Sequence, residues 1–207
     1  MRRTARSLCG TALVLSWSQP PVLSAQISPL QVEVRGGAAV PAQEFADPGG
    51  LAGEADPGAS FGVHFSLAQG HLSWYVGFSE SRFACGGAAC GEDFVSTGWD
   101  LGVRLNLASG PVIPWIKIGT TAQIAEGRLT DPLLDPLPGE VVPTFPAESS
   151  RAWGLEVGAG VMLRVAERFG LNPGVRYLTV NTSFSGRDVG ALNIRAWVVD
   201  LGLVLGF

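Results

Sequence analysis

Histidines and cysteines, which can act as bases, nucleophiles or metal ligands, number only two and three in this chain of 207 residues. The two histidines, His64 and His71, are the side chains best suited to proton transfer near neutral pH. Cys85 and Cys90 are spaced to close a small disulfide loop in an oxidising compartment. A metal pair is the alternative, but no second pair of His or Cys residues completes a metal site. We therefore expect a disulfide, no bound metal and no cofactor.

Nine charged residues form a further set, because they stand singly among small residues and glycines. They are Glu33, Arg35, Asp100, Arg104, Lys117, Glu156, Arg164, Arg176 and Asp200. A solvated face would instead carry abundant Lys, Glu, Ser and Thr. Isolated charges of both signs in such surroundings indicate a narrow interior in which acids and bases pair.

The overall composition excludes several classes of protein. Only 15% of the residues are charged and 46% are hydrophobic, which argues against a disordered chain or a coiled coil. The net charge of -4 and the pI near 5.2 give no basic surface for nucleic acid. The mean hydropathy of +0.27 is high for a soluble protein. Yet no segment beyond the N-terminus approaches the roughly 18 to 20 apolar residues of a membrane helix.

The N-terminus has the layout of a signal peptide. Arg2, Arg3 and Arg6 precede a mostly apolar stretch over residues 8–17, and a small residue, Ala25, follows. A short membrane anchor is the alternative, but this stretch is too short to span a bilayer. We expect residues 1–25 to be a cleaved signal peptide and residues 26–207 to form one domain.

Apolar residues recur with period two after the signal, which is typical of β-strands with two different faces. In the last segment the large apolar residues share one face: Trp197, Val199, Leu201, Leu203, Leu205 and Phe207. Eight strands are predicted near residues 28–37, 59–67, 71–82, 94–107, 111–124, 151–165, 169–182 and 192–207. Tight turns alternate with longer connections at 38–58, 83–93, 125–150 and 183–191, as in an up-and-down meander.

The large apolar faces must meet either a core or lipid. A soluble lipocalin-like barrel would turn them inward. The small second face with its isolated charges favours the opposite, an all-β, eight-stranded antiparallel up-and-down transmembrane β-barrel. Aromatic girdles toward the strand ends are expected from Trp74, Trp99, Trp153, Trp197, Tyr177 and Phe207.

Eight strands enclose an interior just wide enough for side chains. The nine charges are therefore expected to form a packed, ion-paired lumen. A gate for protons or ions is the alternative use of the same charges. His64 is predicted to face this lumen and to hydrogen-bond there, with Glu33 or Tyr75 as partner.

Two segments carry a family resemblance. Val157–Arg164 and Phe169–Tyr177 resemble the penultimate hairpin of small outer-membrane β-barrel proteins of the OmpA/OmpX-like group, and the terminal Phe207 completes the match. The resemblance implies a location in the outer membrane, with lipid as a partner. It also implies that the insertion machinery reads Phe207. Some such barrels are lipid A-modifying enzymes, but neither His64 nor His71 has a Ser and an acid spaced as in those enzymes.

The expected function is therefore non-enzymatic: a structural or surface-interaction role through the long loops, with an unidentified surface ligand and no nucleic acid. The acidic residues of those loops lack the spacing of a calcium loop. A narrow transport or small-ligand-binding barrel is the alternative, and a lipid A-modifying enzyme is a third.

Overall fold

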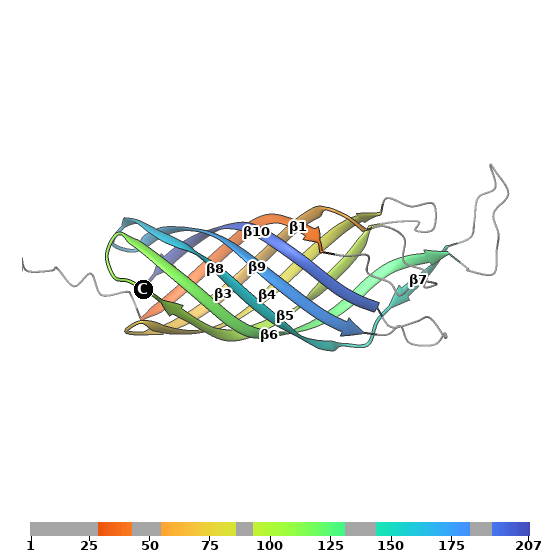
Figure 1. Cartoon of the computed structure of the whole chain (residues 1–207), viewed down its shortest axis with the longest axis horizontal. Helices are drawn as coiled ribbons and strands as arrows, with labels where there is room; N and C mark the ends of the chain where they lie inside the picture. Colours follow the sequence, from red (N-terminus) through yellow and green to blue (C-terminus); the bar gives the residue numbers. More distant parts are fainter. Residues whose placement is uncertain (1–28, 43–54, 86–92, 131–143, 183–191) are drawn as a thin grey trace, which may run out of the picture.

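The computed structural model describes residues 29–42, 55–85, 93–130, 144–182 and 192–207 (Figure 1). Within these ranges the long strands are β1 (Leu30–Pro41), β3 (Gly58–Gln69), β4 (Leu72–Cys85), β5 (Phe94–Asn106), β6 (Val112–Thr130), β8 (Ala152–Ala166), β9 (Phe169–Thr182) and β10 (Leu192–Gly206). Two short strands, β2 (Ala55–Asp56) and β7 (Thr144–Glu148), pair with β4 and β6. No helix in the described part of the chain is long and apolar enough to cross a membrane.

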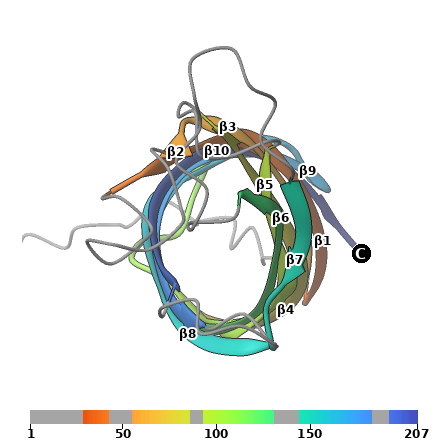
Figure 2. The same cartoon turned by 90° about the vertical axis from the view of Figure 1, so that its right-hand side faces the viewer.

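The eight long strands form a closed barrel. Each pairs antiparallel with the next long strand in the chain, and β1 also pairs with β10, from Gln31 opposite Gly206 to Pro41 opposite Ala196. Figure 2 shows the resulting ring. Closure satisfies the backbone groups that the first and last strands of an open sheet would leave unpaired. The predicted eight-stranded antiparallel up-and-down barrel is confirmed.

The strand limits differ from the prediction mainly at one end of the barrel. β1 continues to Pro41, and β6 continues to Thr130 because β7 provides a partner for its last residues, with Glu126 opposite Glu148. Both β2 and β7 lie in segments that were predicted as loops. The prolines around β7 indicated a loop, but Pro146 is tolerated because β7 is an edge strand.

The two ends of the barrel are named here by their connections. The turn end carries the tight turns after β3, β5 and β8, and Gly70 and Gly110 adopt positive φ angles of 63° and 126° in two of them. The loop end is the opposite end, where β7 lies (Figure 1) and where β2 pairs with the last residues of β4. The positions of side chains along the lumen are given below relative to these two ends.

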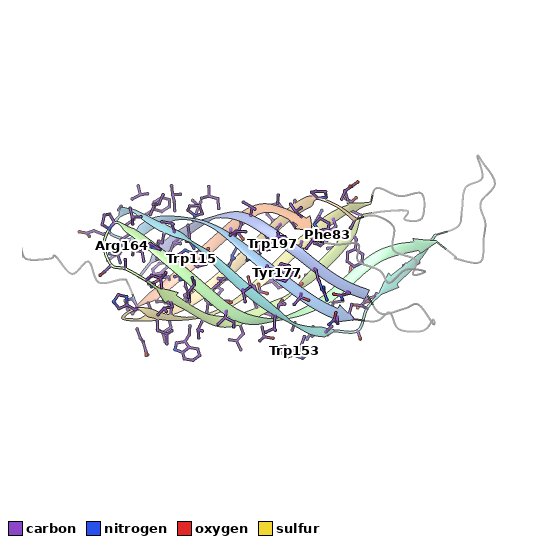
Figure 3. All side chains as sticks on the ribbon, viewed as in Figure 1. Phe83, Trp115, Trp153, Arg164, Tyr177 and Trp197 are labelled. Atoms are coloured by element: carbon purple, nitrogen blue, oxygen red, sulfur yellow. The ribbon has the colours of Figure 1, made fainter. Side chains whose placement is uncertain are left out.

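The outer face of the barrel is apolar over most of its length. Trp153 is 69% exposed and Val165 is 62% exposed, and large apolar side chains project outward from every long strand (Figure 3). The prediction that the large apolar residues point away from the interior is confirmed. A closed, water-surrounded barrel would bury such residues instead.

The aromatic residues of the outer face are only partly arranged as predicted. Tyr177 and Trp197 lie opposite each other in β9 and β10, with ring centroids 4.9 Å apart, near the middle of the wall rather than at its ends (Figure 3). Cross-strand aromatic packing explains this pair. Trp99 and Trp153 flank the outward-facing Ala122, which is only 4% exposed.

Candidate functional site: the charged lumen

The lumen holds four acidic and four basic side chains that are buried, a count that covers the described residues. We call them the charge cluster: Glu33, Arg35, Asp100, Arg104, Lys117, Glu156, Arg176 and Asp200. Their alternation with outward apolar residues brings all eight inward from β1, β5, β6, β8, β9 and β10. The formal charges balance, so the cluster places no net charge inside the barrel.

Glu156 of β8 is the most connected acid of the cluster. Its Oε1 atom accepts hydrogen bonds from Lys117 Nζ at 2.5 Å and from Arg176 Nη1 at 3.3 Å. Its Oε2 atom accepts a hydrogen bond from the hydroxyl of Tyr75 at 3.3 Å. The Lys117 ammonium also lies 5.2 Å from the centre of the Tyr75 ring. Glu156 therefore joins side chains from β4, β6 and β9.

Asp200 joins the first and last strands. It accepts hydrogen bonds from Arg176 Nε at 2.9 Å and from Arg35 Nη1 at 3.4 Å. Arg35 lies on β1 and Asp200 on β10, so this ion pair crosses the seam that closes the barrel. Arg176 Nη2 also donates to the hydroxyl of Ser60, at 3.1 Å.

Glu33 connects the cluster to the turn end. It accepts hydrogen bonds from Arg104 Nη1 at 3.4 Å and from Asn172 Nδ2 at 3.0 Å. Arg104 Nη2 donates to Gln31 Oε1 at 2.9 Å. Because β1 and β5 are not neighbours in the barrel, the Arg104–Glu33 pair spans the lumen.

His64 lies inside the same cluster. Its Nε2 atom is 3.3 Å from Asp100 Oδ2, and its ring contacts Arg35 Nη2 and stacks on Tyr75 with centroids 5.1 Å apart. A guanidinium has no acceptor, so the geometry fits the tautomer in which Nδ1 accepts from Arg35 and Nε2 donates to Asp100. His64 faces the lumen as predicted and lies against Tyr75, but its polar contacts are with Arg35 and Asp100.

Two layers enclose the charge cluster along the barrel axis. On the loop side lies an apolar layer of Ala39, Phe83, Ala125, Ala152, Leu178, Val180, Ile194, Ala196 and Val198. On the turn side lies a smaller layer of Ile113, Trp115, Met162 and Val204. The charge cluster thus lies between two apolar layers, and on the turn side Arg104 also bonds to Gln31.

Glycines leave the room that the large lumen side chains need. A Cβ atom on Gly119 would overlap the hydroxyl of Tyr75, and one on Gly160 would overlap the ring of Trp115. Both glycines face inward. Gly160 of β8 lies directly opposite Trp115 of β6, and Gly119 of β6 is two strands away from Tyr75 of β4. The many glycines of the inner face therefore follow from the packing of the lumen.

The remaining predicted residues lie toward the ends of the strands. Arg164 is half-buried near the turn end of β8, where it lines a small cavity together with Gln31 and Arg168. His71 follows the turn after β3, and its Nδ1 atom lies 2.9 Å from the backbone oxygen of Asn106. Phe207 is 62% exposed and donates its backbone N–H to Leu30. Cys85 ends β4, but Cys90 and the predicted signal peptide lie outside the described residues.

Sequence reasoning missed the neutral polar members of this lumen. Gln31 bonds to Arg104, and Asn172 bonds to Glu33. Trp115 Nε1 in turn donates to Asn172 Oδ1 at 2.6 Å. Each lies on the charged face of its strand, and that position was the available signal. No group of three or more His, Cys, Asp or Glu side chains in the described ranges is placed to hold a metal ion.

Comparisons with known proteins identify the fold. No sequence family matches the chain, and no curated protein matches it in sequence. The crystal structure of Neisserial surface protein A matches with a TM-score of 0.62 and 17% identity, covering 87% of this chain and 98% of that one. The outer membrane protein OprG of Pseudomonas aeruginosa matches with a TM-score of 0.58 and 14% identity, covering 88% and 99%. The chain therefore has the fold of the small eight-stranded outer-membrane barrels.

Proposed function

We propose that this protein is an integral outer-membrane protein with a closed lumen, and that it acts through the surface it presents at the loop end. The observation that carries the proposal is the charge cluster, whose members bond across the barrel and fill its middle. In this view the barrel is a rigid support and the interaction chemistry lies outside it.

The closed lumen is argued from the contacts of the cluster. Arg104–Glu33 and Tyr75–Glu156 bridge strands that are not neighbours, and the side chains involved are at most 6% exposed. A continuous water path would require several of these contacts to part together. Breaking a buried ion pair such as Arg104–Glu33 is costly, about 3 to 5 kcal/mol. The geometry therefore favours a lumen filled by side chains rather than an open pore.

The membrane location is argued from the outer face. Apolar side chains there are exposed on all eight long strands, whereas the charge cluster is buried in the lumen. The charge cluster faces inward and the large apolar side chains face outward, although Glu80 and Arg82 near the loop end of β4 are outward polar residues. This inside-out distribution matches what hydrocarbon requires of a spanning barrel. The exposed aromatic Phe207 follows the last strand and is the residue we propose the insertion machinery reads.

The surface role is argued from the connections. The segments that join β1 to β2, β4 to β5, β6 to β7 and β9 to β10 are far longer than the turns at the opposite end. Long connections on a rigid scaffold are where binding residues are usually found. We propose a non-enzymatic role for them, because neither His64 nor His71 is placed with a serine and an acid at an accessible rim.

Two measurements test the proposal. The protein in separated outer membranes should migrate differently on SDS gels before and after boiling, because a closed barrel resists cold detergent. Purified protein in planar bilayers should give no current steps above the protein-free baseline. A protein found in the soluble periplasmic fraction without a gel shift would contradict the membrane location. Steady single-channel currents would contradict the closed lumen and favour the narrow transport barrel instead.

A further inference from the structure

Buried polar atoms without a hydrogen-bond partner gather in one part of the lumen. In the described chain six such atoms occur, and four belong to Ser73, Arg104 and Asn106: Ser73 Oγ, Arg104 Nε, and Asn106 Nδ2 and Oδ1. These side chains are 0%, 5% and 1% exposed. The other two atoms, Arg35 Nε and Asn193 Oδ1, lie elsewhere on β1 and β10.

The three residues share one face of two adjacent strands. Ser73 of β4 lies directly opposite Arg104 of β5, and Asn106 is two residues further along the same inward face of β5. Asn106 is itself opposite Trp115 of β6, in the turn-side apolar layer. The unpartnered atoms therefore lie together between the charge cluster and the turn end. Below we call Ser73, Arg104 and Asn106 the β4–β5 polar site.

Six buried polar side chains on the loop side of the cluster are bonded to one another in two groups. Gln123 Nε2 donates to Thr121 at 2.6 Å and to Ser79 at 3.3 Å, and Gln123 Oε1 accepts from Ser96 at 3.1 Å. The hydroxyls of Ser60 and Ser81 also lie 3.3 Å apart. Buried polar groups in proteins are generally paired, so the turn-side exception indicates a bound partner.

The chemistry of the β4–β5 polar site selects that partner. Arg104 Nε and Asn106 Nδ2 donate, Asn106 Oδ1 accepts, and the Ser73 hydroxyl does both. An anion would leave the Asn106 oxygen unpartnered and would unbalance a cluster that already holds four charges of each sign. We propose that the site binds ordered water, which is small, neutral and able to donate and accept at once.

A route for this water leads to the turn end. Arg104 Nη2 donates to Gln31 Oε1 at 2.9 Å, and Gln31 lines the turn-end cavity of about 20 Å³ together with Arg164 and Arg168. That volume is enough for one water molecule. In this proposal water reaches the β4–β5 polar site from the turn end, a feature that the closed barrel alone does not imply.

The test is water-to-protein magnetisation transfer by NMR, on the isotope-labelled protein in phospholipid nanodiscs. The probe is the side-chain amide of Asn106. Gln123 provides the matched control, because its amide is also buried in the lumen and is bonded to protein hydroxyls. Relay through exchanging hydroxyl protons would therefore appear at Gln123 as well. We expect a cross-peak at the water frequency for Asn106 and none for Gln123.

Two variants complete the test. Ser73→Ala should weaken the Asn106 cross-peak, because the water loses one of its partners. Asn106→Leu should leave the urea midpoint unchanged or lower it, because it removes satisfied groups. A missing Asn106 cross-peak, or one equal to that of Gln123, would overturn the proposal. So would a raised urea midpoint in Asn106→Leu, which is expected of a dry site relieved of two unpaired polar atoms.

Discussion

Replacing Glu156 by glutamine isolates the electrostatic part of the lumen packing. Glutamine keeps the shape of the side chain and can still accept the hydrogen bond from Tyr75, but it carries no charge. In the wild-type protein Glu156 is 1% exposed and faces both Lys117 and Arg176. Arg176 keeps Asp200 as a partner at 2.9 Å in the variant. Lys117 loses its ion pair with Glu156, and its own side chain is 3% exposed.

The magnitude follows from that asymmetry. Breaking a buried ion pair by removing one partner typically costs 3 to 5 kcal/mol, and one of the two cations here remains compensated, so we expect Glu156→Gln to lose about 3 kcal/mol. Adding Lys117→Met removes the orphaned ammonium and replaces it by an apolar chain of similar length. The double variant should therefore recover most of the loss.

The assay is urea unfolding in phospholipid vesicles, followed by tryptophan fluorescence and by the gel shift on boiling. Glu80→Gln is the matched control, because the Glu80–Arg82 pair has a similar N–O distance of 2.7 Å but side chains that are 26% and 57% exposed. We expect it to cost less than about 1 kcal/mol. The reasoning is refuted if Glu156→Gln costs no more than Glu80→Gln, or if Lys117→Met adds to the loss instead of relieving it.

Three further predictions concern packing, lipid contact and redox state. Gly119→Ala should lower the free energy of unfolding by about 1 to 3 kcal/mol, because the new methyl group overlaps the buried hydroxyl of Tyr75. Gly36→Ala is the control in the same urea titration and should be tolerated, because its Cβ would have its nearest neighbour at 3.8 Å. Val199→Lys, at an outward site that is 57% exposed, should lower the free energy of unfolding in vesicles by about 2 to 4 kcal/mol. Val199→Thr is the control. An unchanged free energy of unfolding in Val199→Lys would place that face in water. Cys85 and Cys90 should resist alkylation until reduced, and labelling without reductant would exclude the predicted disulfide.

The fold could be predicted because the inward and outward faces differ in residue size as well as in polarity. Alternation of large apolar residues with glycine and single charges identifies a membrane barrel, since a soluble sheet would carry a densely polar second face. Strand limits at the loop end were predicted less well. The extension of β6 depends on its pairing with β7, and a partner that is distant in sequence leaves no periodic signal.

The sequence could predict which residues of the candidate site face the lumen, but not which of them bond to one another. The inward position of Glu156 follows from its strand, whereas its bonds to Lys117, Arg176 and Tyr75 depend on the shear of the closed barrel. Arg164 alternates like the other bases but lies near the end of β8, where it lines the turn-end cavity. Alternation alone gives the face of a residue and not its depth.

The Arg35–Asp200 pair across the closing seam constrains the order of assembly. Until β1 meets β10, these two charges lie on opposite edges of an unfinished sheet, and the rest of the cluster lacks its last links. Carrying such a sheet into hydrocarbon would bury charges without partners, which is strongly opposed. If the protein has the proposed membrane location, entry into the bilayer and joining of the first and last strands must therefore advance together, and insertion of one strand at a time is disfavoured.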